Sequence, residues 1–460
     1  MGKKRILLLF PDGVGIRNYL YSDIFKNADA ELVLYHSFDQ KTVVDIKNTT
    51  GIAKDIVIPK YSESAKEKFL RELICLCRLK QNAKQLANPT LLTNWNTNHK
   101  KLSKKLFYKL IEWVSLGVKN YDTILKLEHM HQKSMRNNPF YEKVTRQIQE
   151  IKPDVVFCSH QRAVQAAPIF EAASDLGIKT TTVVFSWDNL PKARMAVKAD
   201  KYLVWSDYMK QEMKGYYPEI SEEDVLVTGT PQFEFYGNPS NIIPKDIFYK
   251  QYNLDTDKKI ICYSGDDALT SPDDPMYLEN LADELQKHNL EDEYQILLRR
   301  CPVDLSGRFD LVIQKYPDLI KVAPPVWNFK DKNDWTVIYP LFEDVKLLVS
   351  TAYYCDVVLN VGSTMAFDFG MFNKPCIFIN YDQPQKKVKK WSVDTIYQFE
   401  HFKSMPDSRA VIWLNNKEEI VSKIHKALNN YSANHIADWK ERVIGNHLTS
   451  SQRIRKVLEI

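Results

Sequence analysis

The stretch of sequence that decides the fold is DVVLNVGSTMAFDFGMFNKPCIFINYD, from Asp356 to Asp382. The apolar run Val357–Leu359 predicts a buried strand, and Gly362-Ser363-Thr364 predicts a tight turn into a short helix that carries Asp368. A second apolar run, Cys376–Ile379, predicts a parallel strand. In such a β-α-β unit, backbone N–H groups and hydroxyls gather at the positive end of the helix dipole. The stretch therefore predicts a phosphate or nucleotide site, with Asp368 placed to reach a ribose hydroxyl.

The composition predicts a folded protein of two domains. The chain has 460 residues, which exceeds one ordinary hydrophobic core and suits two domains of roughly 200 residues each. Hydrophobic residues make up 44% and charged residues 26%, the balance of a globular protein, and no low-complexity tract is present. We therefore expect an ordered chain throughout both halves.

Cysteine usage and hydropathy predict a cytoplasmic protein. The seven cysteines are an odd number, and most lie inside or beside apolar runs, as buried thiols do. No Cys/His spacing typical of a zinc site occurs, so no metal site is expected. No run of about 18 apolar residues occurs either, so we expect a soluble or membrane-peripheral protein.

Short β-branched runs alternate with helical patterns through both halves, which predicts α/β architecture with parallel sheets. Gly, Asn, Ser and Pro gather near 235–244, so we place the boundary between the halves there. The predicted domains are 1–236 and 246–437, with a last helix over 438–460 and a helical insertion over 60–150. The predicted strands are 5–10, 31–35, 55–58, 154–158, 181–185, 202–205 and 225–227, then 260–263, 295–298, 320–322, 336–339, 357–359, 376–379 and 411–414.

The insertion is strongly basic. Residues 60–150 hold 18 Lys and Arg against 8 Asp and Glu, whereas the whole chain has a net charge of only +5. Two sets of side chains fall on opposite faces of one predicted helix: Leu102, Leu106, Leu110 and Trp113, and Lys101, Lys104, Lys105 and Lys109. Such a helix can lie on an anionic membrane surface, here the inner face of the cytoplasmic membrane; the alternative is a helix packed on its own domain with its lysines in solvent. No nucleic-acid-binding motif organises these lysines, so nucleic acid is not expected as a partner.

The segment 356–382 also carries a family resemblance. The Ser-Thr pair at 363–364, the acidic residue at 368 and Lys374-Pro375 before an apolar strand resemble the donor-binding segment of GT-B glycosyltransferases. Similar proteins of bacterial surface and capsular polysaccharide biosynthesis include UDP-glycosyltransferases and CDP-glycerol glycerophosphotransferases. The resemblance implies two Rossmann-like domains with parallel sheets facing a central cleft, the acceptor on the N-terminal side and the nucleotide on the C-terminal side.

Strand ends in the second half offer groups for a nucleotide diphosphate. Ser264-Gly265 is interpreted as a small-residue turn after the strand 260–263, where a phosphate can approach the backbone. Arg299 follows the strand 295–298, and arginine grips a diphosphate bidentately; Arg300 in that role, or an ion pair at the surface, is the alternative. The predicted donor-binding residues are Ser264, Gly265, Arg299, Gly362, Ser363, Thr364 and Asp368.

Loops at strand ends in the first half carry the candidate catalytic residues, because Asp12, His160 and Asp188 each follow a predicted strand. An inverting transfer needs one base to take the proton of the acceptor hydroxyl, a task suited to His or to a well-placed Asp. For each of the three a purely structural role is the alternative, and the sequence leaves the choice open. Arg17, in the loop after the first strand, is the predicted contact for an anionic acceptor.

Together with the resemblance, these residues imply a glycosyltransferase that moves a sugar from a nucleotide diphosphate-sugar, UDP-linked by the family's habit, to a glycan or lipid-linked acceptor. The reaction is expected to be inverting and metal-independent, with the nucleotide-sugar as co-substrate and no further cofactor. The alternatives are a CDP-glycerol or polyol-phosphate transferase of the same fold, a nucleotide-sugar epimerase, and a non-catalytic GT-B-like binding subunit of a polysaccharide assembly complex.

Overall fold

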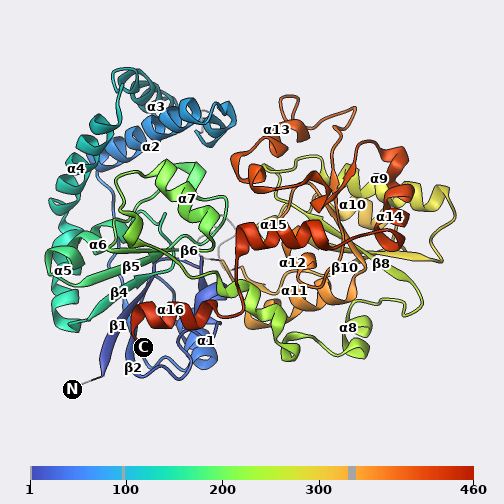
Figure 1. The fold of residues 1–460 in the computed structure, drawn as a ribbon, viewed down its shortest axis with the longest axis horizontal. Helices are drawn as coiled ribbons and strands as arrows, with labels where there is room; N and C mark the ends of the chain where they lie inside the picture. Colours follow the sequence, from blue (N-terminus) through green and yellow to red (C-terminus); the bar gives the residue numbers. More distant parts are fainter. Residues whose placement is uncertain (1–2, 96–98, 330–337) are drawn as a thin grey trace. The chain divides into compact units, whose positions relative to one another are not determined.

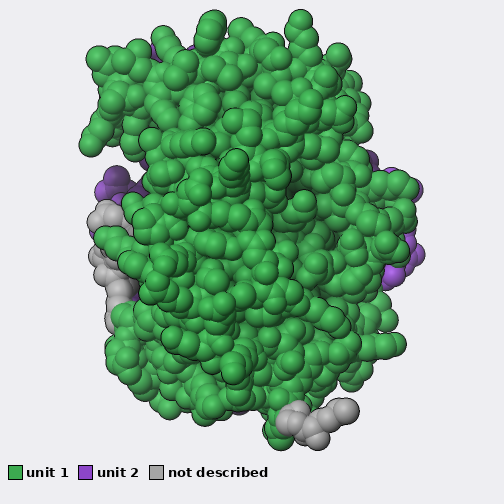
Figure 2. Space-filling view, turned by 90° about the vertical axis from the view of Figure 1, so that its left-hand side faces the viewer, with its two compact units in different colours: residues 1–231, 443–460 green, residues 232–442 purple. Residues whose placement is uncertain are grey.

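The computed structural model describes residues 3–95, 99–329 and 338–460. The chain folds into two compact units, coloured separately in Figure 2. Unit 1 comprises residues 1–231 and 443–460, and unit 2 comprises residues 232–442. The chain therefore leaves the first unit once and returns to it at its C-terminal end.

A wholly parallel, seven-stranded sheet forms the centre of unit 1, in the order β3-β2-β1-β4-β5-β6-β7. Strand β1 lies inside this sheet, and its side chains from Ile6 to Phe10 are fully buried. Both faces of a parallel sheet are covered, which explains the continuous apolar run in the sequence. The strands are β1 (Lys4–Phe10), β2 (Ala30–His36), β3 (Lys54–Val57), β4 (Val155–Cys158), β5 (Lys179–Val183), β6 (Lys201–Val204) and β7 (Val225–Val227).

Amphipathic helices cover the unit 1 sheet (Figure 1). Helix α5 packs on α6, and α6 packs on β4 and β5. The apolar faces of α5 and α6 join Leu7 and Leu9 of β1 in one buried cluster. The helices outside the insertion are α1 (Gln40–Thr50), α6 (Ala166–Asp175), α7 (Asp207–Tyr216) and the terminal α16 (Ser450–Leu458).

The predicted insertion is helical: α2 (Ala65–Gln85), α3 (Leu102–Ser115), α4 (Tyr121–Arg136) and α5 (Pro139–Ile151). Helix α2 begins at a capping box, since Ser64 Oγ accepts the Glu67 N–H at 3.2 Å and the Glu67 carboxylate accepts the Ser64 N–H at 2.7 Å. The buried guanidinium of Arg78 in α2 forms ion pairs with Glu128 of α4 and Glu219. These charges bind α2 to α4 and to the segment after α7.

A six-stranded, wholly parallel sheet forms the centre of unit 2, in the order β10-β9-β8-β13-β14-β15. Its strands are β8 (Lys259–Gly265), β9 (Tyr294–Arg300), β10 (Ile320–Val322), β13 (Val357–Asn360), β14 (Cys376–Ile379) and β15 (Ile412–Leu414). The helices of this unit are α8 (Lys245–Gln251), α9 (Asp274–Lys287), α10 (Asp310–Lys315), α11 (Phe342–Tyr354), α12 (Met365–Gly370), α13 (Val393–Tyr397) and α14 (Ile420–Asn429). The predicted α/β class with two Rossmann-like, parallel-sheet domains is confirmed.

One predicted strand of unit 2 has a different place. The prediction 336–339 lies partly outside the described residues, and its described end falls in β12 (Tyr339–Pro340). Strand β12 pairs antiparallel with β11 (Trp327–Asn328) in a separate two-stranded sheet. The large parallel sheet therefore has six strands rather than the seven expected.

The C-terminal segment completes unit 1. Helix α15 (Asn434–Ile444) spans the boundary between the units, and α16 packs within unit 1. Arg453 of α16 donates from Nε to the carbonyl of Thr228 at 2.9 Å. Gly229, at φ +75°, permits this contact, because a Cβ there would lie 2.2 Å from Ser450 Oγ.

Candidate active site

The strand order of unit 1 reverses direction between β1 and β4. From this point the chain runs outward through β2 and β3 on one side and through β5, β6 and β7 on the other. Ligands of open α/β sheets bind outside the carboxyl ends of the strands at such a switch point. In unit 1 the strands at the switch point are β1 and β4, and their carboxyl ends lead into Asp12 and His160.

Asp12 and His160 contact each other at this switch point. His160 Nδ1 lies 2.7 Å from Asp12 Oδ2, and both residues are buried. The other carboxylate oxygen of Asp12 accepts the Val14 N–H at 3.0 Å. The His160 ring packs edge-to-face on Phe185, with centroids 4.9 Å apart. The ring is thus held from two sides by an acceptor and an apolar wall.

A glycine lets the two loops approach. Gly15 has φ +89°, and a Cβ there would lie only 2.7 Å from Ser159 Cβ. Ser159 Oγ donates to the carbonyl of Val14 at 3.2 Å, which joins the loop after β1 to the loop after β4. The close packing of Gly15 against Ser159 therefore supports the pairing of Asp12 with His160.

The pairing fixes what the histidine can do. An ionised carboxylate only accepts hydrogen bonds, so Nδ1 of His160 carries the proton shared with Asp12. The neutral ring then presents Nε2 as a lone-pair acceptor, the form that serves as a general base. After taking a proton, the imidazolium is stabilised by the adjacent carboxylate and can return that proton as an acid.

Asp188, the third predicted catalytic residue, has local partners. Its carboxylate accepts from Ser186 Oγ at 2.7 Å and forms an ion pair with Lys192. Two side-chain hydrogen bonds join Asp188 to the loop of His160. Gln161 donates to Asn189 at 3.0 Å, and Asn189 donates to Asp188 at 2.9 Å. Asp188 therefore orders the loop after β5 and lies one loop away from the Asp12–His160 pair.

Arg162 lies with His160 in the loop after β4 and was not predicted as a site residue. Among the described residues, its buried Nε has no hydrogen-bond partner. Burial lowers the pKa of its guanidinium, and the charge of Asp188 acts in the opposite direction. Its position two residues after His160 is the signal that the sequence offered, because a cation at a strand end suits an anionic ligand.

The strand order of unit 2 reverses between β8 and β13, so its switch point lies at Gly265 and Asn360. The turn after β13 has the predicted shape, with Gly362 at φ +68°. The buried Asn360 side chain accepts the Ser363 N–H at 2.8 Å, and Ser363 Oγ accepts the Met365 N–H at 3.4 Å. The Ser363 N–H, which was expected to face an anion, is thus engaged by the Asn360 side chain. Helix α12, which follows Thr364, is only 6 residues long, so its dipole is short.

Ser264 and Gly265 end strand β8 and do not form the predicted turn. Strand β8 runs on to Gly265 because the Gly265 carbonyl accepts the Cys301 N–H at 2.6 Å. Gly265 is required here for packing, since a Cβ would lie 2.7 Å from Phe309 Cζ. The turn itself begins at Asp266.

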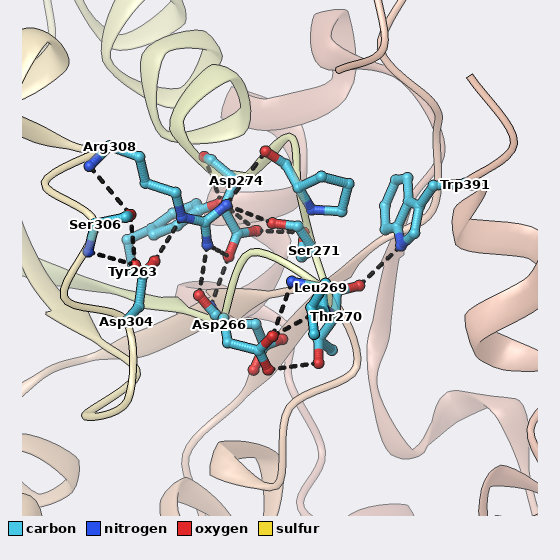
Figure 3. A network of polar contacts seen from close by, with 12 residues as sticks. Tyr263, Asp266, Leu269, Thr270, Ser271, Asp274, Asp304, Ser306, Arg308 and Trp391 are labelled. Carbon is cyan, nitrogen blue, oxygen red and sulfur yellow. Dashed lines mark hydrogen bonds and ion pairs between the residues drawn. The ribbon is translucent and has the colours of Figure 1, made fainter. Parts of the chain in front are cut away.

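That turn is closed by a buried polar network (Figure 3). Arg308 donates to the Asp266 carbonyl at 2.5 Å and to the Asp304 carboxylate at 2.5 Å. The Asp274 carboxylate accepts the Asp266 N–H at 2.6 Å and the Ser271 hydroxyl at 2.7 Å. Burial, followed by the neighbouring Asp274 charge, raises the pKa of Asp266 well above its usual range, and burial raises the pKa of Asp274 to about 6.

Arg299 is buried in an ion pair. Its Nη2 donates to both carboxylate oxygens of Asp344 in α11, at 3.1 and 3.0 Å. Asp344 also accepts from the Val326 N–H and the Trp327 indole, both at 2.8 Å. Among the described residues, Arg299 Nη1 is buried without a partner. Nη2 of the guanidinium is thus engaged by Asp344. The phosphate contact predicted for Arg299 stays a prediction, and Nη1 is the group that it would use.

Asp368 and Arg17 also have local partners. The Asp368 carboxylate accepts the Tyr236 hydroxyl at 2.6 Å within unit 2. Arg17 lies in the short helix Ile16–Leu20 of unit 1 and donates from Nε to Asn18 Oδ1 at 3.0 Å. The ribose contact predicted for Asp368 stays a prediction, as do the phosphate contacts of Gly362, Ser363 and Thr364.

Within residues 3–95, 99–329 and 338–460, no group of three or more His, Cys, Asp or Glu side chains could hold a metal ion. No helix in these ranges is both long and apolar enough to cross a membrane.

The sequence matches no protein-family model and no curated protein sequence. Solved structures share its fold over nearly the whole chain. UDP-GlcNAc 2-epimerase from Neisseria meningitidis bound to UDP-GlcNAc aligns with a TM-score of 0.53 and 10% identity, over 99% of this chain and 98% of that one. The Methanocaldococcus jannaschii UDP-GlcNAc 2-epimerase aligns with a TM-score of 0.52 and 12% identity, over 99% of each chain. A glycosyltransferase from Rickettsia africae aligns with a TM-score of 0.51 and 13% identity, over 100% and 98%.

These comparisons contradict the predicted function. The similar structures are repeatedly UDP-GlcNAc 2-epimerases, and epimerisation is a different reaction from the predicted transfer of a sugar to an acceptor. The motif at 356–382 indicated a nucleotide site, and a fold with such a site hosts more than one chemistry. The acceptor contact assigned to Arg17 depended on transfer and loses its basis. At this level of identity the similarity establishes the fold: the chain has a GT-B-like fold of two Rossmann-like domains.

Proposed function

We propose that this protein is an enzyme that acts on a nucleotide-sugar and changes the configuration of its sugar. The observation that carries the proposal is the contact between Asp12 and His160, a buried acid/base pair 2.7 Å apart at the switch point of unit 1. Support for the substrate class comes from the shared fold, because the N. meningitidis epimerase of that fold is bound to UDP-GlcNAc. A UDP-sugar is therefore the first substrate to test.

The pair suits inversion at a carbon by proton transfer. Such a reaction breaks a C–H bond on one face of the sugar, leaves the electron pair on that carbon, and forms a new C–H bond on the other face, so it needs a base and an acid and no acceptor. His160 is held by Asp12 in the form whose Nε2 takes up a proton, and the carboxylate stabilises the cation that results. Arg162, two residues after His160, adds a positive charge to the same loop, and its buried Nε has no hydrogen-bond partner among the described residues.

The nucleotide is assigned to the switch point of unit 2. Ser363 and Thr364 are half-buried and lie at the turn after β13, at the carboxyl end of a strand. Nη1 of Arg299, which has no partner in the part of the chain that the structure describes, lies near the end of β9, the neighbour of β8 in the same sheet. These groups are donors of the kind that hold a diphosphate.

The test is conversion of UDP-GlcNAc, followed by proton NMR of the sugar signals. Wild-type protein is expected to produce a second UDP-sugar of equal mass. Once the two UDP-sugars reach equilibrium, no net release of UDP is expected. Asp12→Asn and His160→Asn are expected to lower the rate at least about a hundredfold, the scale of a lost acid/base group. The matched control is His288→Asn, an exposed histidine of unit 2 that pairs with Glu284 at the surface, and it should retain the wild-type rate. Failure to isomerise any UDP-sugar tested would overturn the proposal.

A further inference from the structure

Helix α3 exposes an apolar stripe on the surface of unit 1. The side chains that form it, named here the α3 patch, are Leu102, Leu106, Leu110 and Trp113. Leu102 and Trp113 are each 71% exposed, Leu106 is 60% exposed and Leu110 is 48% exposed. An exposed tryptophan in line with three exposed leucines exceeds the isolated apolar residues of an ordinary surface and marks an interaction site.

The helix has a second apolar face, which explains why the α3 patch is not used for packing. Ile111 is fully buried, and Phe107 and Tyr108 pack with it in the core of the insertion. Phe107 lies edge-to-face on Phe69, and Tyr108 lies edge-to-face on Trp95. The core of the insertion is therefore complete without the α3 patch.

The surroundings of the α3 patch are cationic. Residues 99–120 hold six lysines and one acidic residue. The acid, Glu112, is half-buried and accepts the Trp95 indole N–H at 3.0 Å, so it faces the core of the insertion. The lysine that caps α3 and the lysines within it are exposed: Lys101, Lys104, Lys105 and Lys109. Lys105 and Lys109 lie beside the leucine stripe and not opposite it as the sequence predicted, because they follow Leu102 and Leu106 by three residues. Residues three apart are neighbours on a helix surface.

We infer that the α3 patch docks the protein on an anionic lipid bilayer. The leucines and Trp113 would enter the headgroup boundary while the lysines contact acidic headgroups, the arrangement by which amphipathic helices lie in a membrane interface. At 14 residues, α3 is about 21 Å long, so it lies along the surface and does not cross the membrane. The inference is independent of the reaction proposed above.

Charge distinguishes the bilayer from two other possible occupants of the α3 patch, a second copy of the chain and a nucleic acid. A second copy of the chain would bring the same lysines face to face, which like-charge repulsion disfavours. A nucleic acid would match the lysines but would leave three leucines in contact with phosphates and sugars. A bilayer with acidic lipids matches both the apolar stripe and the lysines.

The experiment is co-sedimentation of the full chain with phosphatidylcholine vesicles, with and without phosphatidylglycerol. The protein is expected to bind the phosphatidylglycerol vesicles, and added salt is expected to weaken that binding. Lys105→Glu with Lys109→Glu should reduce the partition coefficient at least about tenfold, because each basic residue contributes to binding separately. The control with the same change in net charge is Lys417→Glu with Lys426→Glu, two exposed lysines of unit 2, which should bind like wild type.

A second pair of variants tests the apolar part. Leu106→Ser with Trp113→Ser should also reduce partitioning at least about tenfold, since buried apolar area drives insertion. The control is Leu311→Ser with Leu448→Ser, exposed leucines outside the α3 patch. Unchanged thermal unfolding of the variants shows that they are folded.

Three outcomes would overturn the inference. The first is absence of binding to acidic vesicles. The second is binding that the α3 variants and their controls reduce equally. The third is a dimer, detected by sedimentation velocity, that Leu106→Ser with Trp113→Ser dissociates while vesicles bind none of the protein.

Discussion

His160 Nδ1 lies 2.7 Å from Asp12 Oδ2, although 148 residues separate them in the chain. The parallel pairing of β1 with β4 places the ends of both strands at the same edge of the sheet. Each residue follows its strand by two positions, so the contact is a direct product of the strand order. Two candidates that the sequence offered separately thus contact each other as one buried Asp–His unit.

Gly15→Ala should disrupt this unit. Its φ of +89° disfavours any side chain, and the new Cβ would lie 2.7 Å from Ser159 Cβ, so the two loops must separate. A shift of this kind in a catalytic pair costs about a hundredfold in rate. The control is Gly51→Ala, at φ +73° with no atom within 4 Å of the new Cβ, which should cost roughly 1–2 kcal/mol of stability and leave the turnover rate unchanged. Equal rates for the two variants would contradict this reading of Gly15.

Asp344→Ala should strongly destabilise unit 2. The substitution leaves the buried charge of Arg299 unpaired and also removes the acceptor of the Val326 N–H and the Trp327 indole. Breaking a buried ion pair from one side costs about 3–5 kcal/mol, measurable by denaturant unfolding. Glu279→Ala, which removes an exposed pair with Lys315, should cost less than about 1 kcal/mol. If both variants unfolded at the same denaturant concentration, the buried pair would not be structural.

The Asp274 carboxyl predicts a pH dependence of stability. Burial raises its pKa to about 6, above the ordinary value of 3.8, so the folded state binds its proton more tightly than the unfolded chain. Its contribution to stability is therefore fully present below pH 3.8 and is lost as the pH rises through about 6, by at most about 1.4 kcal/mol per pH unit.

The measurement for Asp274 compares unfolding free energies of wild type and Asp274→Asn across that pH range. The wild-type value should fall relative to that of the variant as the pH rises. Asp257→Asn, an exposed carboxyl of the same unit, should follow the wild type at every pH. Parallel curves for wild type and Asp274→Asn would show that the carboxyl does not titrate in this window.

Ser363→Ala with Thr364→Val should weaken the binding of UDP, measured by calorimetry, by about tenfold or more. Hydrogen bonds to a charged group contribute about 1.5–3 kcal/mol each, and both hydroxyls lie at the turn after β13. Ser240→Ala provides the control, since this exposed serine donates to Asn238 within its own turn. Undiminished binding by the double variant would remove these hydroxyls from the nucleotide site.

The fold was predictable because its signals are local. The apolar runs of β1, β13 and β14 are the buried strands of parallel sheets, and glycines mark the turns after β1 and β13. Where distant residues decide, the prediction failed: β8 extends to Gly265 because Cys301 continues its ladder.

The contact between the two candidate catalytic residues could not be predicted from the sequence. Asp12 and His160 were identified from their positions after strands, whereas their contact depends on the order of strands in the sheet. The partner of Arg299 is Asp344, which lies 45 residues away on a helix. No sequence motif predicts this pairing. The predicted reaction type was wrong because the motif at 356–382 predicts a nucleotide site and carries no information about an acceptor.

The most direct test of the central claim is deuterium incorporation from D2O during conversion of UDP-GlcNAc, read by NMR and mass spectrometry. If Asp12 and His160 transfer the proton, the product should carry one deuterium at the inverted carbon, and Asp12→Asn should suppress incorporation and conversion together. A product without deuterium, or conversion that Asp12→Asn and His160→Asn leave at the wild-type rate, would contradict the account.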